Sequence, residues 1–425
     1  MVIRTTPPSL QQLEKIKIIE AKKIALDNGI PVYSINAGVQ DVAKLMFIFP
    51  AGDVYHPEGV IASASSHLID DGTSTKSAAQ IAETFDFYGA SIECENDFHQ
   101  GTITLYTLNK FLEPTLDLIL EIIGSPAYSE AEVENYVNRN VQQLLVSDEK
   151  VDYLARKNFR AALFGNHPYG HTAEVEDYKK LNGSDLKKFA SAHYNFANCQ
   201  IIISGKVSDE QLNLLNKKIG SLSLSKKNEI KPESGLEKIA PQPLIKKRIA
   251  KENAVQAAIR IGKVMVTRTH PDYKKLLLLN TVLGGYFGSR LMSNIREDKG
   301  YTYGIGSTLV ANPFAGNLVI GTEVGVNVCN NALEEIYKEI DILTKEPIPV
   351  EELAVVKNYI TGSFLKSLDG PFELAQRFHT LLTFGLGYNY YYDYLEAIKN
   401  ATSEELMVLA QKYFKQDSFT EIVVG

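Results

Sequence analysis

The chain of 425 residues contains only three cysteines, and their positions exclude two classes of protein. Cys94, Cys199 and Cys329 lie far apart, so no C-x-x-C or similar metal-binding spacing occurs. So sparse and scattered a set also predicts no disulfide framework.

Long apolar runs and a basic surface are also missing. No stretch reaches the roughly 18 apolar residues of a membrane-spanning helix, and residues 1–15 contain no apolar run of signal-peptide length. The net charge is −7, and the Lys and Arg residues are scattered rather than gathered into a stripe that would bind phosphates. We therefore expect a cytoplasmic protein that binds neither a membrane nor nucleic acid.

The elements that the sequence does predict occur in a repeated order. A chain of this length, with 44% apolar residues, can fill two or more hydrophobic cores. Two helices and two strands are expected at 61–69, 77–88, 90–96 and 101–107, and again at 271–283, 289–297, 303–311 and 317–324. Each half then ends in a helix and an apolar strand, at 185–194 and 200–205 and at 404–414 and 420–425. The offset of about 220 residues indicates two copies of one unit.

Within each half the strands follow an antiparallel pattern. Segments 23–26 and 30–35 flank Asn28-Gly29, a typical hairpin turn. Runs of strands alternate with long helices at 111–123, 130–146 and 350–367, which favours an α+β fold with mostly antiparallel mixed sheets packed with helices.

A polar stretch between the halves predicts the domain boundary. Residues 221–243 are rich in Ser, Lys, Glu and Pro and end in Pro241-Gln242-Pro243. Such a segment buries little surface and suits a connector over the outside of the molecule. We assign a first domain to residues 1–222, a linker to 223–245 and a second domain to 246–425.

Several short motifs, in their order and spacing, carry a resemblance to a known family. They are His67 with Gly72-Thr73, and the runs 49–52 (FPAG), 163–170 (LFGNHPYG) and 288–303 (GSRLMSNIREDKGYTY). Together they resemble the pitrilysin/insulinase family of zinc metallopeptidases, in the branch of the mitochondrial processing peptidase and its bacterial relatives. The likeness covers nearly the whole chain, and it implies two homologous halves that face each other across a cavity.

The catalytic motif of that family is degraded here. Active members carry H-x-x-E-H on a helix, where the two His bind zinc and the Glu is the general base. Aligning His67 with the second His puts Ser63 at the first His and Ser66 at the Glu. Gln142 and Gln143 lie near the expected place of the last carboxylate ligand. Ser and Gln supply neither the charge nor the basicity, so we expect no metal and no catalytic residue in this chain alone.

Two other groups of residues could be read as metal ligands. The first group is an improvised site from His67, Asp70, Asp71 and Glu93. The alternative interpretation is that His67 is simply a helix residue inherited from an active ancestor. His167 and His171 lie four apart, but Pro168 breaks helical geometry between them, which favours an ordinary turn.

Arg296 and Tyr303, by contrast, match a kept motif. In active relatives an Arg and a Tyr at this spacing reach across the cavity and hold the substrate backbone. Both side chains donate hydrogen bonds, which would stabilise the charge that develops on a scissile carbonyl. The alternatives are a surface salt bridge for Arg296 and a sheet aromatic for Tyr303. Tyr301 is a second candidate for the phenol, and Arg290 is expected to be structural.

The resemblance therefore implies a non-catalytic, peptide-binding subunit of a heterodimeric zinc peptidase. Its partner would be a homologous subunit that carries H-x-x-E-H and the zinc, and its substrate an unfolded peptide. In the family an edge strand pairs with the substrate, and segment 90–96 is the candidate. Glu93, Glu95 and Asp97 would favour basic or neutral peptides there. The alternatives are a scaffold protein, like the core subunits of respiratory complexes, and an autonomous peptidase with an unorthodox metal site. The isolated chain could also form a homodimer.

Overall fold

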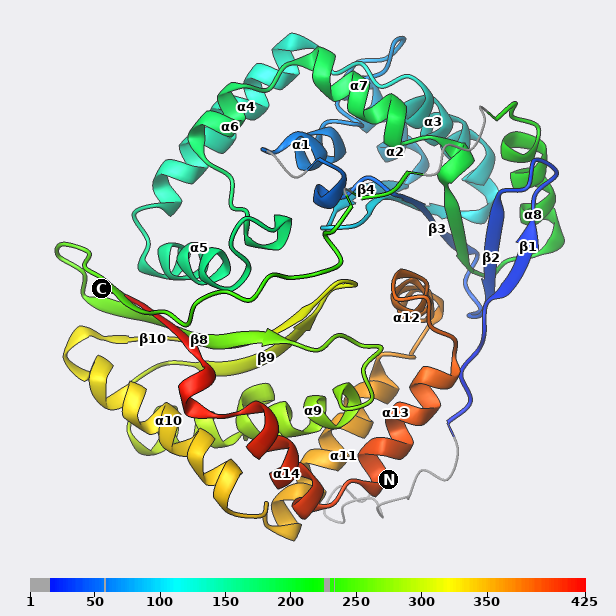
Figure 1. Ribbon diagram of the computed structural model, residues 1–425. Helices are drawn as coiled ribbons and strands as arrows, with labels where there is room; N and C mark the ends of the chain where they lie inside the picture. Colours follow the sequence, from blue (N-terminus) through cyan, green and yellow to red (C-terminus); the bar gives the residue numbers. More distant parts are fainter. Residues whose placement is uncertain (1–15, 57–58, 225–229, 233) are drawn as a thin grey trace, which may run out of the picture.

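The chain folds into two mixed β-sheets with helices packed on both faces of each (Figure 1). The computed structural model describes residues 16–56, 59–224, 230–232 and 234–425. The strands of the first sheet, in spatial order, are β1 (Lys22–Ala25), β2 (Pro31–Asn36), β6 (Gln200–Gly205), β3 (Val42–Phe49), β5 (Gly101–Leu108) and β4 (Ser91–Asn96). Those of the second sheet are β7 (Lys246–Ile249), β11 (Thr420–Val424), β8 (Gln256–Met265), β10 (Gly316–Gly325) and β9 (Ile305–Ala311).

The two sheets share one topology. In each, one pair of neighbours is parallel, β2 with β6 and β7 with β11, and the other neighbours are antiparallel. Strand β1 is an addition to the first sheet only. The α+β fold with two homologous halves is therefore confirmed.

The helices divide between the halves in a matching order. The first half contains α1 (Ile61–His67), α2 (Ala78–Tyr88), α3 (Leu112–Gly124), α4 (Glu130–Ser147), α5 (Val151–Phe164), α6 (Val175–Lys179), α7 (Gly183–His193) and α8 (Asp209–Leu215). The second contains α9 (Tyr273–Asn280), α10 (Cys329–Lys345), α11 (Val350–Lys366), α12 (Pro371–Thr383), α13 (Asn389–Asn400) and α14 (Ser403–Tyr413). Two π-helical segments, η6 (Thr281–Gly285) and η7 (Met292–Asp298), stand where the sequence predicts ordinary helix.

Local sequence signals explain several element boundaries. Helix α2 begins after Ser77, whose side chain forms a capping box with Gln80, and ends at Gly89, whose φ of 58° closes the helix in the left-handed region. In the predicted hairpin between β1 and β2, only Gly29 of the Asn-Gly pair has a positive φ, 86°.

The outer face of each sheet packs against helices of its own half. Helices α1 to α4 and α7 cover the first sheet, and α9, α10, α11 and α14 cover the second. Aliphatic side chains that alternate along the strands, such as Leu45 and Phe47 on β3 and Ile259 and Ile261 on β8, supply the two cores. Burial of this apolar surface is the main force that holds each half together.

The inner faces are covered by an exchange of helices between the halves (Figure 1). Helix α5 of the first half packs Ala155 and Phe159 on Ala258 and Ile422 of the second sheet. Helix α12 of the second half packs Phe378 and other apolar residues on the first sheet, at Ile35, Met46 and Ile202. Each sheet thus has its central strands buried by the opposite half.

The linker is less peripheral than its composition predicts. Helix α8 continues into the π-helical segment η5 (Asn216–Gly220), and the described residues between η5 and β7 form turns and coil, as expected. However, Leu236, Ile239 and Ile245 pack against the cluster between α5 and the second sheet. Segment 225–229 and residue 233 lie outside the described residues. The three apolar side chains are half-buried, while most of the described residues around them are exposed.

Candidate functional site

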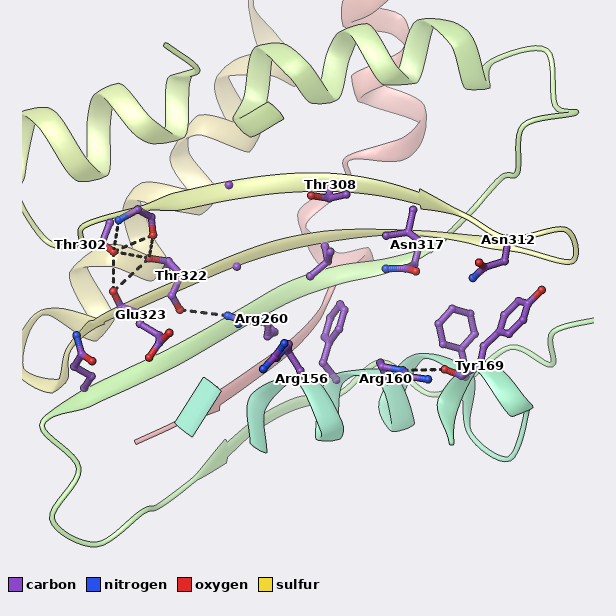
Figure 2. Close-up of a pocket in the computed structure, with 18 of the residues that line it drawn as sticks. Arg156, Arg160, Tyr169, Arg260, Thr302, Thr308, Asn312, Asn317, Thr322 and Glu323 are labelled. Carbon is purple, nitrogen blue, oxygen red and sulfur yellow. Dashed lines mark hydrogen bonds between the residues drawn. The ribbon is translucent and has the colours of Figure 1, made fainter. Parts of the chain in front are cut away.

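A cavity lies between α5 and the inner face of the second sheet (Figure 2). Its volume is about 770 Å³. One wall comes from α5 and the turn after it, with Arg156, Phe159, Arg160, Phe164 and Tyr169. The other comes from the strands and the turn before β9, with Tyr303, Thr308, Asn312, Asn317 and Glu323 among others.

Strand periodicity decides which side chains form the sheet wall, a mixture of polar and small apolar residues. On β10 the residues Asn317, Val319 and Gly321 line the cavity, while Leu318 and Ile320 point into the outer core. Thr308 and Val310 do the same on β9, whereas Leu309 is buried. Because β9 is the edge strand and α5 lies over β8 and β11, this part of the face stays uncovered.

Three arginines give the cavity a positive charge. Arg156 and Arg260 share the carboxylate of Asp152, with 2.8 Å between Arg156 Nη2 and Asp152 Oδ2. Arg160 donates from Nε to the carbonyl of Tyr169 at 3.1 Å, and its guanidinium lies 5.3 Å from the centre of the Phe98 ring. Burial lowers the pKa of Arg160 and of Arg260 from the usual value. Against these charges the lining includes one carboxylate, Glu323.

The structure brings Arg296 and Tyr303 together at one end of this cavity. Arg296 lies in η7, and its Nε donates to the backbone carbonyl of Tyr303 at 3.1 Å. The guanidinium stacks on Phe287, 4.6 Å from the ring centre, and Nη1 lies 3.6 Å from Glu297. The Tyr303 side chain is 96% exposed and lines the cavity. Arg296 thus fixes the backbone of Tyr303 and leaves its phenol free to bind a ligand.

The turn that carries Tyr303 is tied to the sheet beside it. Thr302 Oγ1 donates to the carbonyl of Glu323 at 2.7 Å, and Thr322 Oγ1 donates to that of Gly304 at 3.0 Å (Figure 2). These bonds hold the backbone on both sides of Tyr303. Because this backbone is already held in place, less conformational entropy is lost when a ligand binds.

The two other residues considered for this site have structural partners. Tyr301 packs against the core of the second half, so its phenol is not presented as that of Tyr303 is. Arg290 forms a bidentate pair with Glu352, with both hydrogen bonds at 2.8 Å.

The residues of the degraded motif lie on α1, apart from the cavity lining. Ser66 is fully buried, while His67 is exposed with Nδ1 2.7 Å from the carbonyl of Ser63. Tyr136 of α4 fills the adjoining space, since its ring lies 6.2 Å from that of His67 and its hydroxyl approaches Ser63. Gln142 and Gln143 are exposed on α4. One imidazole and no carboxylate do not fit a tetrahedral zinc site.

The improvised alternative does not assemble either. Asp70 forms a hydrogen bond with Cys94, whereas Glu93 points to the other face of β4 and accepts from Tyr106 at 3.0 Å. Burial raises the pKa of Asp70. Among the residues that the structure describes, no group of three or more His, Cys, Asp or Glu side chains is placed to hold a metal ion.

His167 belongs to a turn, as the sequence predicts. It precedes the 3-10 helix η3 (Pro168–Gly170), where its Nδ1 accepts from the Tyr169 amide at 3.0 Å. Its Nε2 lies 3.0 Å from the carbonyl of Leu236. The ring therefore fastens the linker to the end of α5.

Sequence reasoning missed the three arginines that line the cavity and the ring of Phe287, on which the Arg296 guanidinium stacks. Arg156 and Arg160 are polar residues on an otherwise amphipathic helix, and nothing local shows that this helix faces the other half. The available signal was the alternation of Thr and Asn with aliphatic residues along 303–311 and 317–324. Phe287 directly precedes the motif at 288–303 and could have been noted there.

No helix in the described ranges combines the length and the apolar character that crossing a membrane requires.

Comparisons with known proteins agree with this geometry. Residues 32–175 match the model for "Insulinase (Peptidase family M16)" and residues 180–360 that for "Peptidase M16 inactive domain". An uncharacterized zinc protease, YmxG of Bacillus subtilis, is 28% identical over 82% of this chain and 84% of its own. A protein of Helicobacter pylori named non-peptidase homolog YmxG is 24% identical over 71% of this chain and 70% of its own.

Solved structures share the fold. A peptidase M16 inactive domain from Pseudomonas fluorescens has a TM-score of 0.84 at 21% identity, covering 95% of this chain and 98% of that one. A protease from Helicobacter pylori has a TM-score of 0.86 at 20% identity, covering 96% of this chain and 100% of that one. The two family models together span well over half of the sequence, and the chain belongs to the insulinase family, peptidase family M16.

Proposed function

We propose that this chain is the peptide-binding, non-catalytic subunit of a heterodimeric zinc metallopeptidase. The observation that carries the proposal is the exposed Tyr303 phenol beside Arg296, at the end of a cavity large enough for a peptide segment. Zinc is expected on a homologous partner that carries H-x-x-E-H. This chain contributes no metal ligand and no general base.

The role of Arg296 and Tyr303 is to hold the scissile carbonyl. The guanidinium keeps N–H groups beyond the one bonded to Tyr303, and the phenol has no hydrogen-bond partner among the described residues. Both donors would face the oxygen on which negative charge develops when water attacks the carbonyl carbon. The zinc of the partner would supply the activated water.

The edge strand β4 is the second proposed contact with the peptide. It ends the first sheet, so its outer backbone groups are open to an added strand. Glu93 and Glu95 are exposed on it and favour basic or neutral peptide residues at that place. Arg156, Arg160 and Arg260, which line the cavity, favour acidic peptide residues there.

The test is hydrolysis of a quenched fluorescent peptide by this chain, by an H-x-x-E-H homologue from the same genome, and by their mixture. We expect chelator-sensitive activity in the mixture alone. Arg296→Gln and Tyr303→Phe should each lower kcat/KM of the mixture by about 100-fold, the usual effect of losing one oxyanion donor. Lys299→Gln and Tyr301→Phe are matched controls, because they lie on the same segment without facing the cavity, and they should change kcat/KM less than twofold.

Each alternative function has its own outcome in this experiment. Activity of this chain alone, abolished by chelator, would mean an autonomous peptidase. A mixture no more active than the homologue, with silent substitutions at Arg296 and Tyr303, would mean a scaffold protein. Size-exclusion chromatography of the unmixed chain tests for a homodimer.

A further inference from the structure

A second, smaller cavity lies wholly within the second half and is distinct from the proposed peptide site. Its volume is about 290 Å³. The walls come from the segment after β8 and from α9, α11, α12 and α13, with Arg268, Leu277, Tyr359, Ile360, Ser363, Phe364, Arg377, Tyr390, Tyr391 and Tyr394. Two cations and several hydroxyl groups thus share a small space.

The two arginines have no carboxylate partner within the described part of the chain. Neither Arg268 nor Arg377 lies within 4.0 Å of an Asp or Glu oxygen there, whereas Arg260 and Arg290, which are also shielded from solvent, each pair with a carboxylate. Asp393 on α13 is already engaged by Lys274, at 3.2 Å. Taking a charge from water without a counter-charge costs free energy, so two such groups in one cavity call for an anion.

Aromatic rings hold the guanidinium groups without using their N–H groups. Arg268 lies 5.7 Å from the ring centre of Tyr273 and 5.3 Å from that of Phe384, and Arg377 lies 6.0 Å from Phe364. A cation–π contact uses no N–H group; apart from the approach of Arg268 to the Tyr390 hydroxyl and of Arg377 to that of Tyr391, the guanidinium donors are left for a ligand. Tyr391 donates its hydroxyl to the carbonyl of Arg377 at 2.7 Å, which fixes α13 against α12.

Two further polar atoms at this place are buried and unsatisfied. Arg268 Nε and the Tyr390 hydroxyl have no hydrogen-bond partner of normal geometry within the described chain, although the Arg268 guanidinium lies close enough to the Tyr390 hydroxyl to interact with it. Burial raises the pKa of Tyr390, so its phenol keeps the proton that it can donate. Buried donors without partners are rare, because each one costs about 1–3 kcal/mol.

We propose that this cavity binds a phosphate group, either as free phosphate or as the phosphate of a small organic ester. Arg268 and Arg377 supply paired N–H donors that match phosphate oxygens, and Tyr390 supplies a third donor. A doubly charged group balances the two guanidinium charges, which a single carboxylate does not. Leu277, Ile360 and Phe364 form an apolar wall against which an organic part would pack.

The test measures thermal stability and binding heat of the full chain in phosphate-free buffer at constant ionic strength. The probes are inorganic phosphate, phenyl phosphate and benzoate, with chloride as the reference. We expect both phosphates to raise the melting temperature, as a ligand of the folded state must. Tighter binding of phenyl phosphate than of inorganic phosphate would identify an ester as the natural form, and equal binding would identify free phosphate.

Variants separate a binding role from a structural one. Arg268→Gln and Arg377→Gln should each weaken phosphate binding at least tenfold, yet leave the melting temperature in phosphate-free buffer unchanged or raised, because each removes an unbalanced charge. Arg139→Gln, an exposed arginine on α4, is the control and should bind phosphate as the unmodified chain does.

Three results would overturn the proposal. They are no response of the unmodified chain to millimolar phosphate, the same response in the two variants, or benzoate binding as tightly as phenyl phosphate. A lower melting temperature of both variants without phosphate, combined with no phosphate response of the unmodified chain, would assign the arginines to aromatic packing alone.

Discussion

At the scale of single residues, the orientation of the Arg296 side chain depends on three neighbouring groups: an aromatic ring, a backbone carbonyl and a carboxylate. Phe287 lies under the guanidinium, the Tyr303 carbonyl accepts from Nε, and Glu297 lies 3.6 Å from Nη1. Phe287 is itself 64% exposed, so it contributes little to the core. A large exposed aromatic side chain under a cation is better explained by positioning than by stability.

Phe287→Leu tests this positioning role. Loss of an exposed cation–π contact removes about 1 kcal/mol, so kcat/KM of the two-subunit mixture should fall about fivefold. The melting temperature should stay within a degree of its original value. Phe87→Leu on α2 changes another exposed phenylalanine, away from the cavity, and should have no effect on either quantity. Equal losses in the two variants would contradict the role given to Phe287.

At the scale of elements, the position of α5 depends on a charge cluster as well as on apolar packing. Asp152 in its first turn binds both Arg156 of the same helix and Arg260 of β8. The Arg260 side chain is only 11% exposed, so it depends on this carboxylate for its charge balance. Breaking a pair of this kind leaves a buried charge uncompensated.

Asp152→Asn should therefore destabilise the protein. We expect the free energy of unfolding, measured with urea, to fall by about 2–3 kcal/mol, the cost of leaving a buried charged donor unsatisfied. Glu176→Gln breaks the exposed pair with Lys179 and should leave the free energy of unfolding nearly unchanged. An Asp152→Asn variant as stable as the Glu176→Gln variant would show that α5 is held by packing alone.

Elements were predicted well where their signals are local. Ser77, Gln80 and Gly89 mark the ends of α2 in the sequence, and alternating apolar residues mark β5 and β10. The π-helical segments η6 and η7 were not predicted, because a π-turn keeps a helical pattern of apolar residues and differs only in backbone hydrogen bonds. Arg296 was found through its motif, but Arg156 and Arg260 were not, since their meeting depends on which sheet α5 covers.

At the scale of the whole molecule, a hydrogen-bonded chain joins the two halves. The amide of Phe314, before β10, donates to the Tyr169 hydroxyl at 3.2 Å, and that hydroxyl lies beside Nε2 of His99. His99 follows β4 and packs on the ring of Phe314. Burial lowers the pKa of His99 from 6.5 to about 4, so the neutral ring can accept a hydrogen bond from the Tyr169 hydroxyl.

This arrangement predicts a pH-dependent stability. The unfolded chain protonates His99 below about pH 6.5, whereas the folded chain resists protonation down to about pH 4. The contribution of His99 is therefore complete above pH 6.5 and lost as the pH falls towards 4. His99→Gln keeps an acceptor but does not titrate. The difference in unfolding free energy between the unmodified chain and the variant should shift by about 3 kcal/mol across this window. A constant difference would contradict the prediction.

The whole architecture was predicted only in part. The internal repeat in the sequence indicates two copies of one α+β unit, and the topologies of the two sheets agree with it. How the copies join was not predictable, because an apolar helix face indicates that it will be buried but does not indicate which of the two sheets will bury it. The same ambiguity hid Leu236 and Ile239, whose place beside α5 depends on contacts far away in the sequence.

The exchange of α5 and α12 has a consequence for how such a chain could arise and be divided. Each sheet is completed by a helix that belongs to the other copy, so one copy alone would expose the apolar face of Ile35, Met46 and Ile202 or that of Ala258 and Ile422. The duplicated chain is in effect a domain-swapped dimer whose protomers have become covalently joined. Fragments cut at the linker should therefore be insoluble when expressed separately and should reconstitute a soluble protein when expressed together.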